Sequence, residues 1–151
     1  MKTLLFLTMI VSAAFPNELF RDLQFGSQVN VREFRIVQEG PIVNICERMK
    51  DSKLLGSVSV SSIRYGIINE SLYSVEIKFD GYNAFQNLKK QFISKYGGTY
   101  RWNPENEIYT WREDNVYADL EYKSATGMGS ALIWYEPLKQ KIEQNVSESS
   151  W

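Results

Sequence analysis

Six carboxylates between residues 105 and 121 are the side chains whose types and spacing could carry chemistry. Two carboxyl groups that face each other across a sugar can hydrolyse a glycosidic bond, one as a general acid and the other as a base or nucleophile. No neighbouring pattern indicates a raised pKa for any of them, and most fall on predicted turns or a predicted exposed face. Solvated surface charge is therefore the favoured interpretation for Glu105, Glu107, Glu113, Asp114, Asp119 and Glu121.

The histidine and cysteine counts narrow the chemistry further, because the sequence has no histidine and one cysteine. Hydrolases with a histidine base, His-ligated zinc sites and thiolate metal clusters are thereby excluded. We predict that the protein is not an enzyme, and we assign no catalytic, cofactor-binding or metal-binding residue. Cys46 lies inside an apparent strand, which favours a buried, inert thiol over an exposed redox thiol or an intermolecular disulfide.

A lone Gly-x-Gly, Gly127-Met128-Gly129, resembles part of a dinucleotide-binding loop. Such a loop needs a helix directly after it, since the helix N-terminus holds the phosphates. The residues that follow here indicate a strand, so we discount nucleotide binding.

The stretch EIYTWREDNVYADLEY, residues 107–122, contains four large aromatic side chains. A two-residue turn at 114–115 would pair Trp111 with Ala118 and put most of the rings on one face with branched apolar residues. This pattern is typical of one wall of a core rather than of a surface that stacks ligands. Tyr117 falls on the opposite, exposed face.

Two further hairpins are predicted from alternating apolar and polar residues. The first turns within two residues at Glu39-Gly40, and the second has a three-residue loop at 69–71. The pairs implied are Ile36 with Val43 and Tyr65 with Val75.

A change of period to helical spacing follows the second hairpin. Apolar positions from Phe85 to Tyr96 predict a helix over residues 84–96, with Asn83 as N-cap and Gly97 as C-cap. The later stretch ALIWYEP predicts a strand that Pro137 ends, and LKQKIEQ could form a short terminal helix. We therefore predict an α+β fold: a mostly antiparallel sheet of six or seven strands built from hairpins, with helix 84–96 packed on one face.

The first fifteen residues, MKTLLFLTMIVSAAF, have the pattern of an export signal. A basic residue precedes a short apolar run and then small residues that suit cleavage. We predict a signal peptide at 1–14, a single domain at 15–146 and a frayed tail at 147–151. An apolar first helix is the alternative.

The charge distribution indicates which classes of partner the protein can bind. The formal net charge is −1, and no lysine or arginine cluster exceeds Lys89-Lys90. A nucleic-acid backbone needs a basic stripe, so we expect no nucleic-acid partner, and no stable membrane insertion once the signal is removed.

The order of motifs along the chain resembles a group of small exported bacterial α+β proteins of uncharacterised function. The segments that carry the resemblance are FRDLQFG (20–26), IRYG (63–66), LYSVEIKF (72–79), KYG (95–97) and IWYEPL (133–138). The resemblance implies one α+β domain in the bacterial envelope, and it supplies no catalytic residues.

The leading hypothesis is a non-catalytic binding or protein-interaction module, periplasmic or secreted, with an unidentified protein partner or envelope ligand. Candidate partner-contact residues are Tyr117, Trp102 and Trp134. The alternatives are an envelope solute or glycan binder, a carboxylate-based hydrolase, and an inhibitor-like protein that inserts loop 98–107 into a target.

Overall fold

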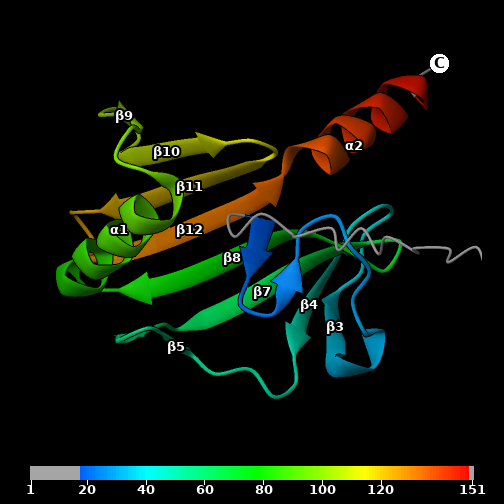
Figure 1. Ribbon diagram of the computed structural model, residues 1–151, viewed down its shortest axis with the longest axis horizontal. Helices are drawn as coiled ribbons and strands as arrows, with labels where there is room; N and C mark the ends of the chain where they lie inside the picture. The colour runs from blue at the N-terminus through cyan, green and yellow to red at the C-terminus, as the bar shows by residue number, and fades with distance from the viewer. Residues whose placement is uncertain (1–17, 150–151) are drawn as a thin grey trace, which may run out of the picture.

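The computed structural model describes residues 18–149, which form an α+β fold around one large antiparallel sheet (Figure 1). The predicted signal at 1–14 and residues 150 and 151 of the predicted tail lie outside this range. The sheet has eight strands in the order β3-β4-β7-β8-β12-β11-β10-β9, so the fold class is confirmed and the sheet is larger than predicted. Its strands are β3 (Phe34–Gln38), β4 (Asn44–Arg48), β7 (Ser62–Ile68), β8 (Ser71–Asp80), β9 (Arg101–Asn103), β10 (Ile108–Glu113), β11 (Val116–Lys123) and β12 (Met128–Tyr135).

Smaller elements complete the fold. Two short hairpins lie outside the main sheet, and a 3-10 turn precedes β3. These are β1 (Leu19–Phe20) with β2 (Leu23–Gln24), β5 (Leu54–Leu55) with β6 (Val58–Ser59), and η2 (Val31–Glu33). The helices are α1 (Tyr82–Tyr96) and α2 (Glu136–Glu148).

The β10–β11 hairpin has the predicted register. Trp111 lies opposite Ala118, and the turn occupies residues 114–115. Trp111 is fully buried, whereas Tyr117 on the other face is half-buried. The alternation of large and small apolar residues was therefore sufficient to set this register, because a slip by one residue would expose the whole apolar set.

The β7–β8 hairpin confirms the predicted pairing of Tyr65 with Val75, but its turn is shorter than predicted. Asn69 and Glu70 alone form the turn, both with positive φ. The register shifts between Gly66 and Ile67, and this irregularity absorbs the residue that a three-residue loop would have held.

The β3–β4 hairpin contradicts the prediction. Ile36 pairs with Cys46 rather than with Val43, and a five-residue loop, 39–43, replaces the two-residue turn. Proline at 41 has no N–H to donate to a ladder, and the side chain of Asn44 accepts a hydrogen bond from the Gly40 N–H at 3.3 Å. A wider loop with its own side-chain bond is the result.

Helix α1 begins two residues earlier than predicted. Gly81, with φ of +92°, precedes the first turn, so Asn83 lies inside the helix rather than at its cap. Gly97 ends it as predicted, and the Gly97 N–H bonds to the Ile93 carbonyl. The buried residues of α1 are Phe85, Leu88, Phe92 and Tyr96, which places the predicted apolar stripe against the sheet.

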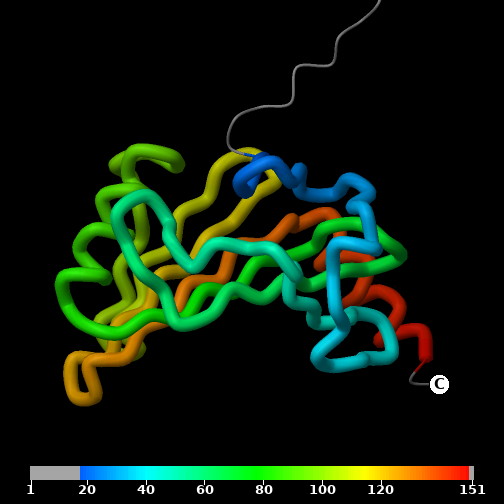
Figure 2. Tube along the Cα trace, turned by 90° about the horizontal axis from the view of Figure 1, so that it is seen from below, coloured from blue at the N-terminus to red at the C-terminus, as the bar shows by residue number. Residues whose placement is uncertain are grey.

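One face of the sheet carries the core. Helix α1 contacts β8, β10 and β11 on this face and also β6 of the separate hairpin, and Phe20 of β1 meets Tyr65 of β7 edge to face. Helix α2 follows directly from β12 and has no buried residue, and Figure 2 places it at the opposite end of the molecule from α1. Neither helix within residues 18–149 has the length and apolar character that crossing a membrane requires.

The Gly-x-Gly of β12 has a packing explanation. Gly127 has φ of +71° in the turn after β11. A Cβ on Gly129 would lie 2.2 Å from the ring of Phe79, which is buried on the neighbouring strand β8. The two glycines therefore allow a tight turn and a ring laid across the backbone.

Candidate functional site

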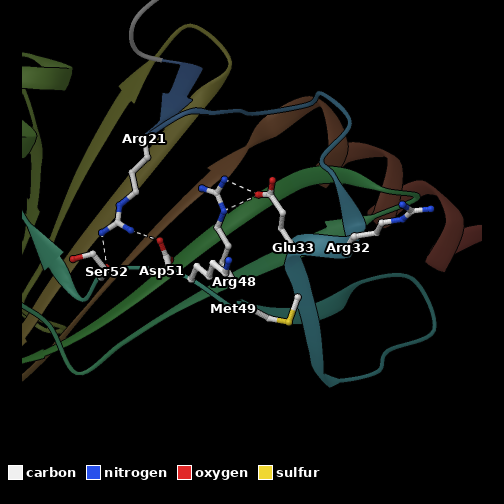
Figure 3. Close-up of a pocket in the computed structure, with 8 residues that line it drawn as sticks. Arg21, Arg32, Glu33, Arg48, Met49, Asp51 and Ser52 are labelled. Atoms are coloured by element: carbon white, nitrogen blue, oxygen red, sulfur yellow. Dashed lines mark hydrogen bonds and ion pairs between the residues drawn. The ribbon is translucent and has the colours of Figure 1, made fainter.

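A cleft of about 760 Å³ opens where the N-terminal segment crosses the end of β4. Figure 3 shows the Arg21 side chain directed toward Asp51 and Ser52 and the Arg48 side chain directed toward Glu33, with Arg32 extending away at the rim. The lining residues are Arg21, Arg32, Glu33, Arg48, Met49, Lys50, Asp51 and Ser52.

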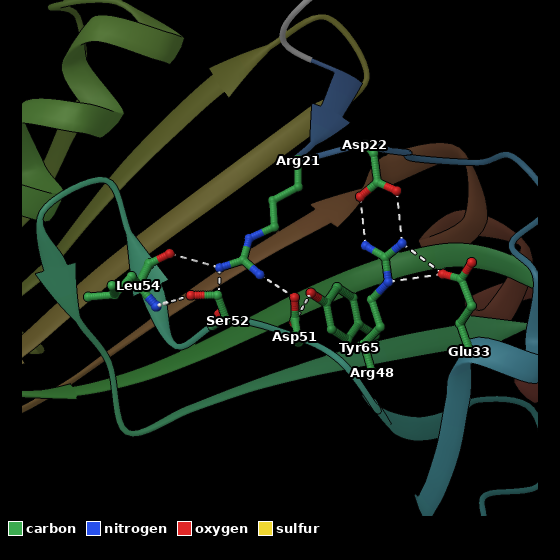
Figure 4. Close-up of polar contacts among 8 residues, drawn as sticks. All are labelled: Arg21, Asp22, Glu33, Arg48, Asp51, Ser52, Leu54 and Tyr65. Atoms are coloured by element: carbon green, nitrogen blue, oxygen red, sulfur yellow. Dashed lines mark hydrogen bonds and ion pairs between the residues drawn. The ribbon is translucent and has the colours of Figure 1, made fainter.

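Arg48, the last residue of β4, holds two carboxylates at once (Figure 4). Its two terminal nitrogens bond to the two oxygens of Asp22 at 2.6 and 2.8 Å. Its Nε and one terminal nitrogen bond to a single oxygen of Glu33 at 3.1 and 2.7 Å. The hydrogen bonds from Arg48 lower the pKa of the Asp22 carboxyl to about 2, and those bonds raise the pKa of Arg48 above its usual range.

Arg21 forms the second half of the network. Its guanidinium bonds to the Asp51 carboxylate and to the carbonyls of Ser52 at 2.6 Å and Leu54 at 2.9 Å. The Tyr65 hydroxyl, buried behind the cleft lining, donates to the other oxygen of Asp51. Burial first, and then the hydrogen bond to Asp51, raises the pKa of Tyr65.

The charges of the cleft do not cancel. Four cationic side chains line it and only two carboxylates do, with Asp22 as a third just outside. Arg32 and Lys50 are exposed and form no ion pair with any residue between 18 and 149. The cleft is thus locally positive on a chain whose formal charge is −1, an arrangement that attracts anions.

The carboxylates of the cleft are poorly placed for acid catalysis. Asp22, Glu33 and Asp51 each accept hydrogen bonds from a guanidinium, and the bonds from Arg48 lower the pKa of Asp22, whereas a general acid must hold its proton near neutral pH. Asp119 is the one carboxyl group between residues 18 and 149 with a clearly raised pKa. Burial causes that shift, and the Thr110 hydroxyl bonds to Asp119 at 2.7 Å on the sheet face away from α1.

The predicted contact residues Tyr117 and Trp134 come together. They lie opposite each other on β11 and β12, with ring centroids 5.5 Å apart. Trp134 is only 9% exposed, because its indole N–H bonds to Glu136 at 2.7 Å and Lys139 lies over its ring. Tyr117 is covered in part by Arg112, at 4.7 Å from the ring centroid.

Trp102 lies far from that pair. It belongs to β9, the opposite edge strand of the sheet from β3, and it shares the α1 face with Tyr109, its partner in the register. Its side chain is 46% exposed. The segment predicted as an inserting loop, 98–107, therefore contains a short paired strand.

The residues of the cleft were not predicted from the sequence. Arg21 and Asp51 are 30 residues apart, and Arg48 and Asp22 are 26 apart, so no local motif joins them. The available signal was the adjacent pair Arg21-Asp22 inside FRDLQFG. Cys46, by contrast, is buried as predicted, and burial raises the pKa of its thiol.

Comparisons with known proteins add no relative to this picture. No family model, no curated protein and no solved structure matches the chain. The resemblance in motif order to small exported bacterial proteins therefore stays a prediction.

Proposed function

We propose that the protein is a non-catalytic binding module that acts after export and receives an acidic segment of a protein partner in the cleft. The observation that carries the proposal is the excess of positive side chains around a space of about 760 Å³ on a chain of net charge −1. Such a local excess steers an oppositely charged partner and fixes its orientation. The proposal that the protein is exported rests on the signal-peptide pattern of residues 1–14.

The preformed contacts of Arg21 and Arg48 favour a binding function for the cleft over a hydrolytic one. Arg48 and Arg21 are held by carboxylates and carbonyls before any ligand arrives, so the walls of the cleft are already ordered when a ligand binds. Arg32 and Lys50 at the rim are the cations left to neutralise that ligand.

The decisive experiment compares two double charge reversals with equal effects on net charge. Arg32→Glu with Lys50→Glu alters the rim, whereas Lys90→Glu with Lys141→Glu alters exposed lysines outside the cleft. The tagged protein is crosslinked in its native envelope, and the captured proteins are identified by mass spectrometry. We expect one recurrent partner that the rim variant loses and the control variant keeps, with capture weakened by salt.

Capture that survives the rim reversal, or that both variants lose equally, would refute the cleft as the docking site. Recovery of self-crosslinks alone would refute the protein-interaction module. Circular dichroism of each variant checks that the fold is intact.

A further inference from the structure

An aromatic cluster at the β9 edge forms a second surface, unrelated to the cleft. Trp102 lies against Tyr109 with ring centroids 4.3 Å apart and an angle of 32° between the rings. Tyr100 meets Tyr109 edge to face at 5.2 Å. Trp102 and Tyr100 are 46% and 37% exposed. Aromatic rings that pack against the core are therefore exposed to solvent at this edge.

The packing fixes the indole of Trp102 as a platform. Tyr109, which supports it, itself contacts Phe85 of α1 and Trp111 of β10, so the support is anchored in the core. A ring held in this way loses little conformational entropy when a ligand stacks on it.

The surroundings of the platform are polar and cationic. The ammonium of Lys89 lies 4.0 Å from the Tyr109 centroid and 5.1 Å from that of Tyr100. No hydrogen bond within residues 18–149 involves the hydroxyls of Tyr100 and Tyr109, and the exposed Tyr100 can offer its hydroxyl to a ligand. Because Lys89 already occupies the ring faces and repels other cations, a cationic ligand does not fit.

We propose that Trp102, Tyr100 and Lys89 form a carbohydrate-binding surface that takes a hexose or hexosamine unit of a neutral or acidic glycan. The C–H bonds on one face of a pyranose carry partial positive charge and match the negative face of the indole. The sugar hydroxyls match the phenol hydroxyls and the ammonium. This surface is at the opposite edge of the sheet from β3 and β4, so it is independent of the cleft.

The test uses the full protein, isotopically labelled, and short oligosaccharides of N-acetylglucosamine and of galacturonic acid. The indole N–H signals are followed by NMR. We expect the Trp102 signal to move and saturate with at least one oligosaccharide, while the Trp134 signal stays fixed, since Trp134 packs against Tyr117 away from the platform and its N–H bonds to Glu136. Trp102→Ala should weaken binding at least tenfold, and Trp102→Tyr much less.

Leu132→Ala removes an exposed apolar side chain outside the ring cluster and serves as the matched control, with unchanged affinity expected. The proposal is overturned if neither oligosaccharide shifts the Trp102 signal, or if Trp102→Ala and Leu132→Ala bind equally well. A shift produced by an acidic peptide, but by neither sugar, would reassign the surface to a protein partner.

Discussion

Arg48 connects three segments of the chain through one guanidinium. It ends β4, and it bonds to Asp22 of the N-terminal segment and to Glu33 of η2. Its side chain is 16% exposed, whereas its two partners are 65% and 44% exposed. Solvent screening therefore reduces each ion pair, but the guanidinium itself cannot be rehydrated fully in the folded state.

Arg48→Ala should destabilise the protein by about 1.5–3 kcal/mol, the range for hydrogen bonds to charged groups. Arg35→Ala is the control, because Arg35 pairs with Glu47 at 2.8 Å on the surface and its side chain is 69% exposed. That control should cost less than about 1 kcal/mol. Urea unfolding of both variants measures the difference, and equal losses would show that the cleft network does not organise the N-terminal segment.

The contacts of individual side chains were the hardest feature to predict from the sequence. Burial of Trp111 and Cys46 could be inferred, since each lies in an apolar, alternating context. The partners of Arg21 and Arg48 could not, because an ion pair between residues about 30 positions apart leaves no local pattern. Surface exposure is similarly hard to infer: Trp134 is covered by its neighbours, whereas Trp102 is not.

At the scale of elements, turn chemistry decided which hairpins were predicted well. The Asp114-Asn115 turn matched the register of β10 and β11, and apolar alternation on both strands left one solution. The predicted register of the β3–β4 hairpin was wrong because Ile36 and Val37 are exposed on an edge strand. Their apolar character therefore did not mark a buried face. Helix α1 begins earlier than predicted because Gly81, not Asn83, precedes its first turn.

The β7–β8 turn offers a test at this scale. Glu70 has φ of +65° in a two-residue turn after Asn69, a conformation that costs an L-residue with a Cβ about 1 kcal/mol. Glu70→Gly produces the Asn-Gly sequence that such turns favour, and we expect a gain of roughly 0.5 kcal/mol after the entropy of glycine is subtracted.

Glu70→Ala is the control for lost side-chain contacts, since alanine keeps the unfavourable backbone. The backbone bond from the Val29 N–H to the Glu70 carbonyl persists in both variants. Thermal unfolding compares them, and an equal melting temperature for the two would contradict the backbone explanation.

On the scale of the whole molecule, two tyrosines from different layers are buried in one core. Tyr65 belongs to β7 and is fully buried, and Tyr96 ends α1 and is 5% exposed. Burial raises the pKa of both phenols, with smaller contributions from Asp51 at Tyr65 and Glu113 at Tyr96. The hydroxyl of Tyr96 makes no hydrogen bond with residues 18–149, whereas that of Tyr65 bonds to Asp51.

These shifts predict loss of stability in alkali. Below about pH 10, the usual pKa of tyrosine, both phenols are protonated in the folded and unfolded chains. Above it the unfolded chain releases protons that the native protein retains, so stability falls by up to about 1.4 kcal/mol per pH unit for each group. Urea unfolding at about pH 8 and about pH 11 measures the loss.

Tyr96→Phe separates this linkage from general alkaline damage. Removal of an unpaired buried hydroxyl should leave stability at about pH 8 nearly unchanged, yet the loss between the two pH values should shrink. Tyr65→Phe should shrink the same loss, but it should also cost about 1 kcal/mol at about pH 8, because the bond to Asp51 disappears. Lys95, whose pKa burial lowers, contributes with opposite sign in all three proteins and cancels from the comparison. If both variants lose as much stability in alkali as the wild type, the buried phenols do not control it.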